Sequence, residues 1–116
     1  MRRIVQFVIL ILTLQVVSQT NPENFENPIL PGYYPDPSII RVDEDYYMVN
    51  SSFEWFPGMP IHHSKDLINW ELIGYGLSRP DQIPLPKGLG DSKGIYAVTI
   101  RHHKGTFYLI TTCVKC

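Results

Sequence analysis

A carboxylate between two prolines is the residue most suited to chemistry in this chain. Asp36 lies between Pro35 and Pro37, where an apolar run typical of a β-strand begins. Proline fixes its own φ and lacks an N–H group, and Pro37 disfavours the helical conformation at the residue before it. We therefore expect Asp36 on a stiff, extended segment, with a carboxylate that is only partly satisfied. Such a group suits a general base, and a solvent-facing aspartate in a proline-rich turn is the alternative.

An aromatic segment forms the second candidate feature. Phe53, Trp55 and Phe56 fall within four consecutive positions. In an extended chain Phe53 and Trp55 would share one face, and Glu54 and Phe56 the other. Such rings can stack on sugars, but they also pack beneath loops in many proteins. Glu54 is a candidate second carboxylate, and nothing in its spacing shows whether it faces Asp36.

The histidines and cysteines do not form a metal motif. Four histidines occur as two adjacent pairs, at 62–63 and 102–103. Neighbouring strand residues point to opposite faces, so neither pair can chelate one ion in the usual way. Cys113 and Cys116 have the spacing of a redox or zinc motif, but they lack the helix start or second cysteine pair of those motifs. We expect no metal and no cofactor, and a disulfide either between these two cysteines or to one beyond residue 116.

Two other polar segments are interpreted as structural. Asp66 and Asn69 are expected to hydrogen-bond the backbone of the turn that they occupy, and Trp70 is expected to fill the space between sheets. Asn50 begins a formal glycosylation sequence. It lies in a strand leading into the aromatic segment, so we expect poor access and low occupancy.

Composition narrows the class of protein. Of the 116 residues, 12% are aromatic and 18% are charged. Aromatic and β-branched side chains suit the pleated surface of a sheet. The formal net charge is −1 and no basic run is present, so we expect no nucleic-acid partner.

Short apolar runs separated by turn residues predict three hairpins. The expected strand pairs are 38–42 with 46–51, 60–64 with 69–74, and 95–102 with 106–112. Residues 76–94 hold three prolines and four glycines and are expected to form a long loop. No window has a sustained helical period, so the predicted fold class is all-β. The first hairpin is echoed by the third at an offset of 60 to 61 positions, which is typical of propeller blades and can also arise by chance.

The first residues are expected to lie outside the fold. Arg2 and Arg3 precede a largely apolar stretch that ends near Val17, which predicts a signal peptide over 1–18 and a secreted, extracellular protein. A membrane anchor is the alternative, but the stretch is shorter than the ~20 residues that span a bilayer, so no stable membrane insertion is expected. Residues 19–27 are interpreted as a flexible leader. The chain stops directly after a strand-like run, which we interpret as truncation.

Over residues 27–114 the sequence resembles the amino-terminal part of a family 43 glycoside hydrolase of the β-xylosidase or α-L-arabinofuranosidase type. Several long motifs carry this resemblance in the same order. They occupy residues 27–39, 45–47, 51–61, 63–70, 94–97 and 105–112. The resemblance implies a five-bladed β-propeller, of which residues 28–116 would form about the first two blades.

The resemblance also implies an activity and a set of site residues. It implies inverting hydrolysis of O-glycosyl bonds in xylose- or arabinose-containing oligosaccharides and polysaccharides. In this chemistry an acid and a base lie about 6.5–9.5 Å apart on opposite faces of the sugar. Asp36 aligns with the general base, Phe53 with an aromatic wall of the sugar pocket, and Tyr96 with a second wall residue that is usually Trp.

Two departures from the family pattern shape the expectations. Tyr96-Ala97-Val98 stands where Trp-Ala-Pro is usual, which could alter sugar preference. The general acid, a Glu, and the Asp that tunes it lie on later blades, and no residue of this chain occupies those positions. We therefore expect the 116-residue chain to be inactive alone. A non-catalytic sugar-binding remnant is the alternative function, and a small disulfide-linked interaction protein ranks last because two cysteines are too few for a disulfide framework.

Overall fold

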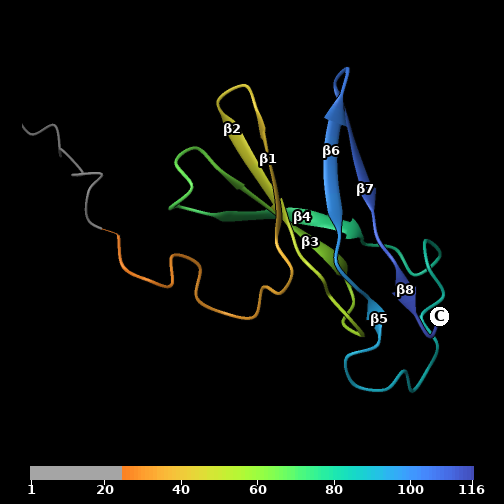
Figure 1. Cartoon of the computed structure of the whole chain (residues 1–116). Coiled ribbons are helices and arrows are strands. Elements are labelled where there is room, and N and C mark those ends of the chain that lie inside the picture. The colour runs from red at the N-terminus through yellow and green to blue at the C-terminus, as the bar shows by residue number, and fades with distance from the viewer. Residues whose placement is uncertain (1–24) are drawn as a thin grey trace, which may run out of the picture.

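The computed structural model describes residues 25–116, which are built from β-strands, turns and loops (Figure 1). Among these residues no helix is long and apolar enough to cross a membrane. The predicted signal peptide over 1–18 and the leader as far as residue 24 lie outside the described residues. The predicted all-β class is confirmed for the part of the chain that the structure describes.

Four strands form one antiparallel sheet with the order β1-β2-β3-β4. The strands are β1 (Ser38–Val42), β2 (Asp45–Val49), β3 (Gly58–Ser64) and β4 (Glu71–Leu77). The first pair has a tight two-residue turn, because Val42 lies opposite Asp45. The two predicted hairpins in this region are therefore present, with strand ends displaced by one to three residues.

The remaining strands form a second, smaller unit. β6 (Thr99–His103) pairs with β7 (Thr106–Ile110), and β5 (Gly94–Ile95) pairs with β8 (Cys113–Val114). Lys104 and Gly105 connect β6 and β7 with φ values of 48° and 78°. Two successive positive φ values are typical of the type I′ hairpin turn, in which glycine is favoured.

The predicted strand over 95–102 is interrupted. Ile95 lies opposite Cys113 and Thr99 lies opposite Ile110, so the three residues 96–98 oppose the two residues 111–112. One extra residue on one strand is the signature of a β-bulge. The extra residue lets Val98, which is 2% exposed, turn its side chain into the core.

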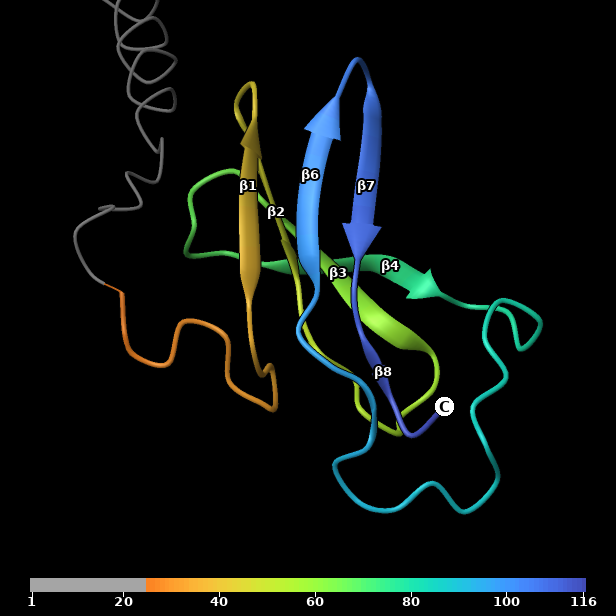
Figure 2. The same ribbon diagram turned by 45° about the vertical axis from the view of Figure 1, so that its right-hand side comes forward.

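The repeat seen in the sequence has a structural counterpart. The hairpins β1–β2 and β6–β7 begin 61 positions apart and both have two-residue turns. β1 and β6 lie side by side in both views (Figures 1 and 2). The backbone N–H of Ile100 donates to the hydroxyl of Ser38 across this junction, at 3.3 Å.

The hydrophobic core lies between the four-stranded sheet and the second unit. Its buried members come from both parts: Val49, Met59, Ile95, Val98 and Ile100. Val49 and Ile95 are fully buried. Packing these two side chains together brings the chain just after β2 against the chain around β5. That junction carries the candidate site.

The turn after β3 confirms the predicted backbone hydrogen bonds of Asp66 and corrects the predictions for Asn69, whose side chain bonds Asp66 instead, and for Trp70. The carboxylate of Asp66 accepts hydrogen bonds from the backbone N–H groups of Ile68 and Asn69 and from the Asn69 side chain. These donors, the Asn69 amide foremost, hold the pKa of Asp66 well below its usual range. Trp70 does not join the core between the sheets, because its indole N–H donates to the carbonyl of Leu67 in the same turn.

The two cysteines pair with each other. Cys113 and Cys116 form a disulfide at the end of β8, with their Cα atoms 5.7 Å apart. Of the two arrangements expected from the sequence, the structure therefore has the local one.

Candidate functional site

Asp36 lies directly before β1 and is exposed. Its Oδ2 accepts a hydrogen bond from the hydroxyl of Ser51 at 2.5 Å. The expectation of an extended backbone is wrong here, because the φ of Asp36 is 50°. Pro37 disfavours the right-handed helical region, and aspartate tolerates the left-handed one better than most residues. The carboxylate is therefore held by a side-chain donor from the segment just after β2, and not by the stiffness of its own segment.

The chain just after β2 holds the Asp36 segment in place. The side-chain amide of Asn50 donates to the carbonyls of Tyr34 and Pro35 at 3.0 and 3.1 Å. The backbone N–H of Ser51 also donates to Pro35, at 3.2 Å. Asn50 is fully buried, which confirms the expected poor access to its glycosylation sequence. Sequence analysis missed Asn50 and Ser51 as site residues; the available signal was a polar pair following an apolar strand.

Phe53 is fixed by the second unit. Its backbone N–H and C=O form reciprocal hydrogen bonds with Ile95, both at 2.9 Å. The φ of Phe53 is 46°, so the expected alternation of faces from Phe53 onwards is wrong. A bulky residue in the left-handed region is a genuine outlier, and such residues concentrate at functional sites. Gly94 permits this approach, because a Cβ atom there would lie 2.2 Å from the carbonyl oxygen of Phe53.

Tyr96 follows Ile95 and therefore lies beside Phe53. The two ring centroids are 5.5 Å apart and the ring planes are inclined by 78°. A third ring, that of Tyr33, lies 6.3 Å from Phe53. The structure thus brings two predicted site residues together as an aromatic corner and links the third, Asp36, to the same stretch of chain through Ser51.

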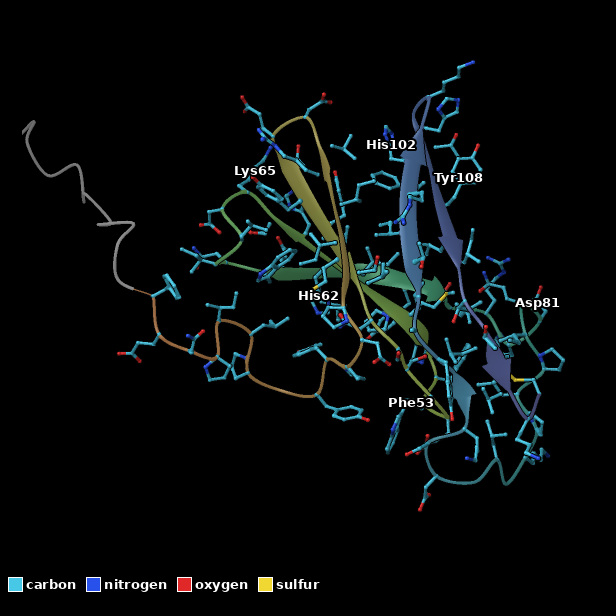
Figure 3. All side chains as sticks on the ribbon, viewed as in Figure 1. Phe53, His62, Lys65, Asp81, His102 and Tyr108 are labelled. Atoms are coloured by element: carbon cyan, nitrogen blue, oxygen red, sulfur yellow. A yellow bond between two sulfur atoms is a disulfide. The ribbon has the colours of Figure 1, made fainter. Side chains whose placement is uncertain are left out.

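An open cavity of about 700 Å³ adjoins this corner. Its lining includes Tyr33, Ser51, Phe53 and His62. Asp36 does not line the cavity but contacts Ser51, which does. Likewise, Tyr96 contacts the lining residue Phe53. Phe53 lies at the opposite end of the described molecule from Lys65 and His102 (Figure 3). An aromatic hollow with a few polar groups beside an exposed carboxylate suits a sugar ring and an attacking water molecule.

Glu54 has a partner other than Asp36. Its Oε2 accepts the backbone N–H of Ser92 at 3.1 Å. Trp55 beside it is 67% exposed and projects from the same cavity wall. The structure therefore does not place Glu54 and Asp36 in a hydrogen-bonded carboxylate pair.

The histidines have separate structural surroundings. His62 is buried against the ring of Tyr34, with centroids 5.0 Å apart, and burial lowers the pKa of His62. His63 lies 2.5 Å from Asp45, which also pairs with Lys65 at 2.7 Å. The hydrogen bond from Lys65, and then that from His63, lowers the pKa of Asp45. Residues 25–116 contain no group of three or more His, Cys, Asp or Glu side chains that could hold a metal ion.

Comparison with known proteins assigns the chain to a family. The profile of glycosyl hydrolases family 43 matches residues 25–116, which are all of the residues that the structure describes. The chain belongs to glycosyl hydrolase family 43. The resemblance inferred from the motifs is therefore confirmed.

Relatives within family 43 are xylosidases and arabinofuranosidases. The chain is 54% identical over 90 residues to a non-reducing end α-L-arabinofuranosidase of Bacteroides ovatus, and the match covers 78% of this chain and 17% of that protein. It is 52% identical over 84 residues to a xylan 1,3-β-xylosidase of a Vibrio species, with 72% and 16% covered.

A solved structure of a xylan β-1,4-xylosidase from Bacillus halodurans superposes with a TM-score of 0.74 at 53% identity. That match covers 80% of this chain and 18% of the solved chain. This family 43 chain thus spans less than a fifth of the length of the relatives that it matches.

Proposed function

We propose that the protein takes part in hydrolysis of O-glycosyl bonds in xylan- or arabinan-type oligosaccharides and polysaccharides, by an inverting mechanism with Asp36 as general base. The observation that carries the proposal is the hydrogen bond from Ser51 to Asp36 beside the Phe53–Tyr96 corner. Residues 51–53 thereby connect the carboxylate of Asp36 to the aromatic rings that are proposed to bind the sugar. Family membership and the xylosidase and arabinofuranosidase relatives support the same chemistry.

In the proposed reaction Asp36 accepts a proton from the water molecule that attacks the anomeric carbon. The Ser51 hydroxyl holds Oδ2 and leaves Oδ1 to receive that proton. Phe53 and Tyr96 bind the sugar through their rings. A general acid about 6.5–9.5 Å from the base protonates the leaving oxygen. We propose that this acid is a glutamate on a later blade of a five-bladed β-propeller, of which this chain forms about the first two blades.

Two further properties belong to this proposal. The protein is secreted, as the basic and apolar start of the sequence predicts. The 116-residue chain alone does not turn over glycosides, because it supplies the base but not the acid. A non-catalytic sugar-binding remnant is the alternative, and it shares the aromatic corner without the turnover.

A hybrid enzyme tests the proposal. Residues 25–116 replace the matching segment of the Bacillus halodurans xylosidase, which supplies the rest of the fold. We expect the hybrid to hydrolyse an aryl β-D-xyloside and to release α-xylose first, as seen by NMR early in the reaction. Release of β-xylose first would contradict inversion. A folded hybrid that binds xylose without hydrolysis would support the remnant.

The chain alone provides the complementary measurement. The purified mature chain is expected to show no activity on the aryl xyloside. Turnover by this chain that Asp36→Asn abolishes would contradict the requirement for an acid from later blades.

A further inference from the structure

Ser92 connects the two sides of the aromatic corner through its backbone. Its N–H donates to Oε2 of Glu54 at 3.1 Å, and its carbonyl accepts the hydroxyl of Tyr96 at 2.9 Å. Ser92 lies exposed in the loop before β5, with a φ of 56°. A residue other than glycine adopts the left-handed conformation only at a cost in free energy. Ser92 therefore holds an unfavourable conformation in which both of its backbone polar groups are tied to neighbours of the candidate site.

These contacts complete a ring of interactions around the Phe53–Tyr96 corner. Glu54 follows Phe53 in the chain, and the Phe53 ring meets the Tyr96 ring at 5.5 Å. The path from Phe53 through Glu54 and Ser92 thus returns to Tyr96 by the tyrosine hydroxyl. The hydroxyl exists because the residue at 96 is tyrosine, so the linkage is a property of this chain and not of an aromatic wall in general.

We propose that Glu54 is a positioning residue that sets sugar selectivity. Its carboxylate holds Ser92, Ser92 holds the Tyr96 hydroxyl, and the angle between the Tyr96 and Phe53 rings is thereby fixed. A fixed corner distinguishes the six-membered chair of a xylopyranose from the five-membered ring of an arabinofuranose, whereas a free Tyr96 ring adapts to both. This inference rests on the proposed function, because it concerns the sugar that the same corner binds.

The chemistry required of Glu54 is that of an acceptor. A glutamine side chain offers a carbonyl oxygen to the same N–H group but cannot act as an acid. Glu54→Gln therefore preserves the linkage, and Glu54→Ala removes it. A second carboxylate with a proton-transfer role would show the opposite pattern, since glutamine would fail as completely as alanine.

Amide hydrogen exchange in the full chain measures the linkage directly. We expect the Ser92 amide to be equally protected in the unmodified protein and in Glu54→Gln, and about three- to tenfold less protected in Glu54→Ala. Glu44→Ala is the matched control, because Glu44 is an exposed carboxylate in the turn after β1. Equal protection of Ser92 in Glu54→Ala, or loss of protection in Glu54→Gln, would overturn the inference.

Sugar binding measures the consequence. The dissociation constants of methyl β-D-xylopyranoside and methyl α-L-arabinofuranoside are determined by NMR titration of the full chain. Glu54→Ala and Tyr96→Phe are each expected to lower the ratio of the larger dissociation constant to the smaller one by at least about threefold. Glu54→Gln is expected to preserve this ratio. Tyr108→Phe, on β7 and far from Phe53 in Figure 3, is the control for loss of a tyrosine hydroxyl.

The possible failures are distinguishable. The chain could bind both sugars with a ratio of dissociation constants that neither Glu54→Ala nor Tyr96→Phe changes. That result would overturn the inference and leave the proposed function intact. Binding of neither sugar would contradict the proposed binding of sugar by the Phe53 and Tyr96 rings of this chain, and the exchange measurement would still decide the linkage from Glu54 to Tyr96.

Discussion

The carboxylate of Asp36 is oriented by residues from a distant segment, the one that follows β2. Its flanking prolines lack the N–H groups that could satisfy it, and the donor comes from Ser51. Asn50 and Ser51 also hold the preceding carbonyls, so the carboxylate and its support move together. A general base needs this arrangement, because one oxygen must be oriented while the other stays open to water.

Ser51→Ala tests this support in the hybrid enzyme. We predict that kcat falls about tenfold while KM stays nearly unchanged, because the hydroxyl donates its hydrogen bond to the proposed base. Ser51→Thr keeps the hydroxyl and should restore most of the rate. Ser52→Ala is the matched control, since Ser52 is equally buried but accepts the backbone N–H of Met59 instead. An equal loss in both alanine variants would argue for a general packing effect.

Asp66 gives a local pH dependence. Its pKa is lowered in the folded turn by the amide donors of Asn69 and Ile68. Because the pKa of Asp66 is lower in the folded turn, its ionised carboxylate stabilises the turn at pH values above its unfolded-state pKa of about 4. This stabilisation is lost as the pH falls towards the pKa of the folded state. Exchange protection of the Ile68 amide should therefore decrease on acidification below about pH 4. In Asp66→Asn this decrease in protection should be absent. If the decrease persists, a group other than Asp66 causes it.

At the residue scale the sequence supplies candidate site residues but not their backbone conformations. Asp36, Phe53 and Tyr96 could be named from residue type, spacing and family resemblance. The left-handed backbones of Asp36 and Phe53 could not, because they depend on Ser51 and Ile95, whose proximity arises only in the folded chain.

The elements of this fold position the site by joining two hairpin units. The pairing of Phe53 with Ile95 connects the chain after β2 to β5, and Val49, Ile95 and Val98 bury the junction. Hairpins were predictable, since they follow from alternating apolar residues between turn signals. The bulge at 96–98 was not predictable, since it reflects the burial of Val98 against a sheet formed by distant residues.

Gly94→Ala tests the junction. The new Cβ would lie 2.2 Å from the Phe53 carbonyl oxygen at a φ of 97°, so the strand pair must separate. We expect the Phe53 and Ile95 amides to lose at least about 2 kcal/mol of protection, or roughly 30-fold in exchange rate. Gly88→Ala separates backbone strain from steric contact, because Gly88 also has a positive φ, 73°, but a Cβ atom there would meet nothing within 4 Å. Comparable effects in both variants would show that backbone strain alone, and not the close approach, is responsible.

The described molecule exposes two apolar surfaces on its outer strands. Leu72 and Ile73 on β4 are 47% and 52% exposed, and Tyr108 and Ile110 on β7 are 49% and 66% exposed. β4 and β7 each lie at the edge of a sheet. Exposed edges with apolar side chains pair readily with other chains. Closure of a propeller would cover such surfaces, which agrees with the proposed fold of the longer family members.

Self-association of the chain alone is the corresponding prediction. Sedimentation velocity should show species larger than the monomer that grow with concentration, and Ile73→Lys with Ile110→Lys should reduce them. Thr106→Lys, at an exposed polar position of β7, should have little effect. A monomer at every concentration with a sharp cooperative melt would contradict the incomplete-propeller interpretation.

The rate of the hybrid xylosidase with and without Asp36 tests the central claim most directly. For Asp36→Asn we predict that kcat/KM on an aryl β-D-xyloside falls by about 10²–10⁴-fold, because the water molecule loses its proton acceptor. Asp43→Asn is the matched control, since Asp43 is also exposed and left-handed, with a φ of 55°, and should retain the full rate. An Asp36→Asn hybrid as active as the Asp43→Asn hybrid would contradict the assignment of Asp36 as the general base.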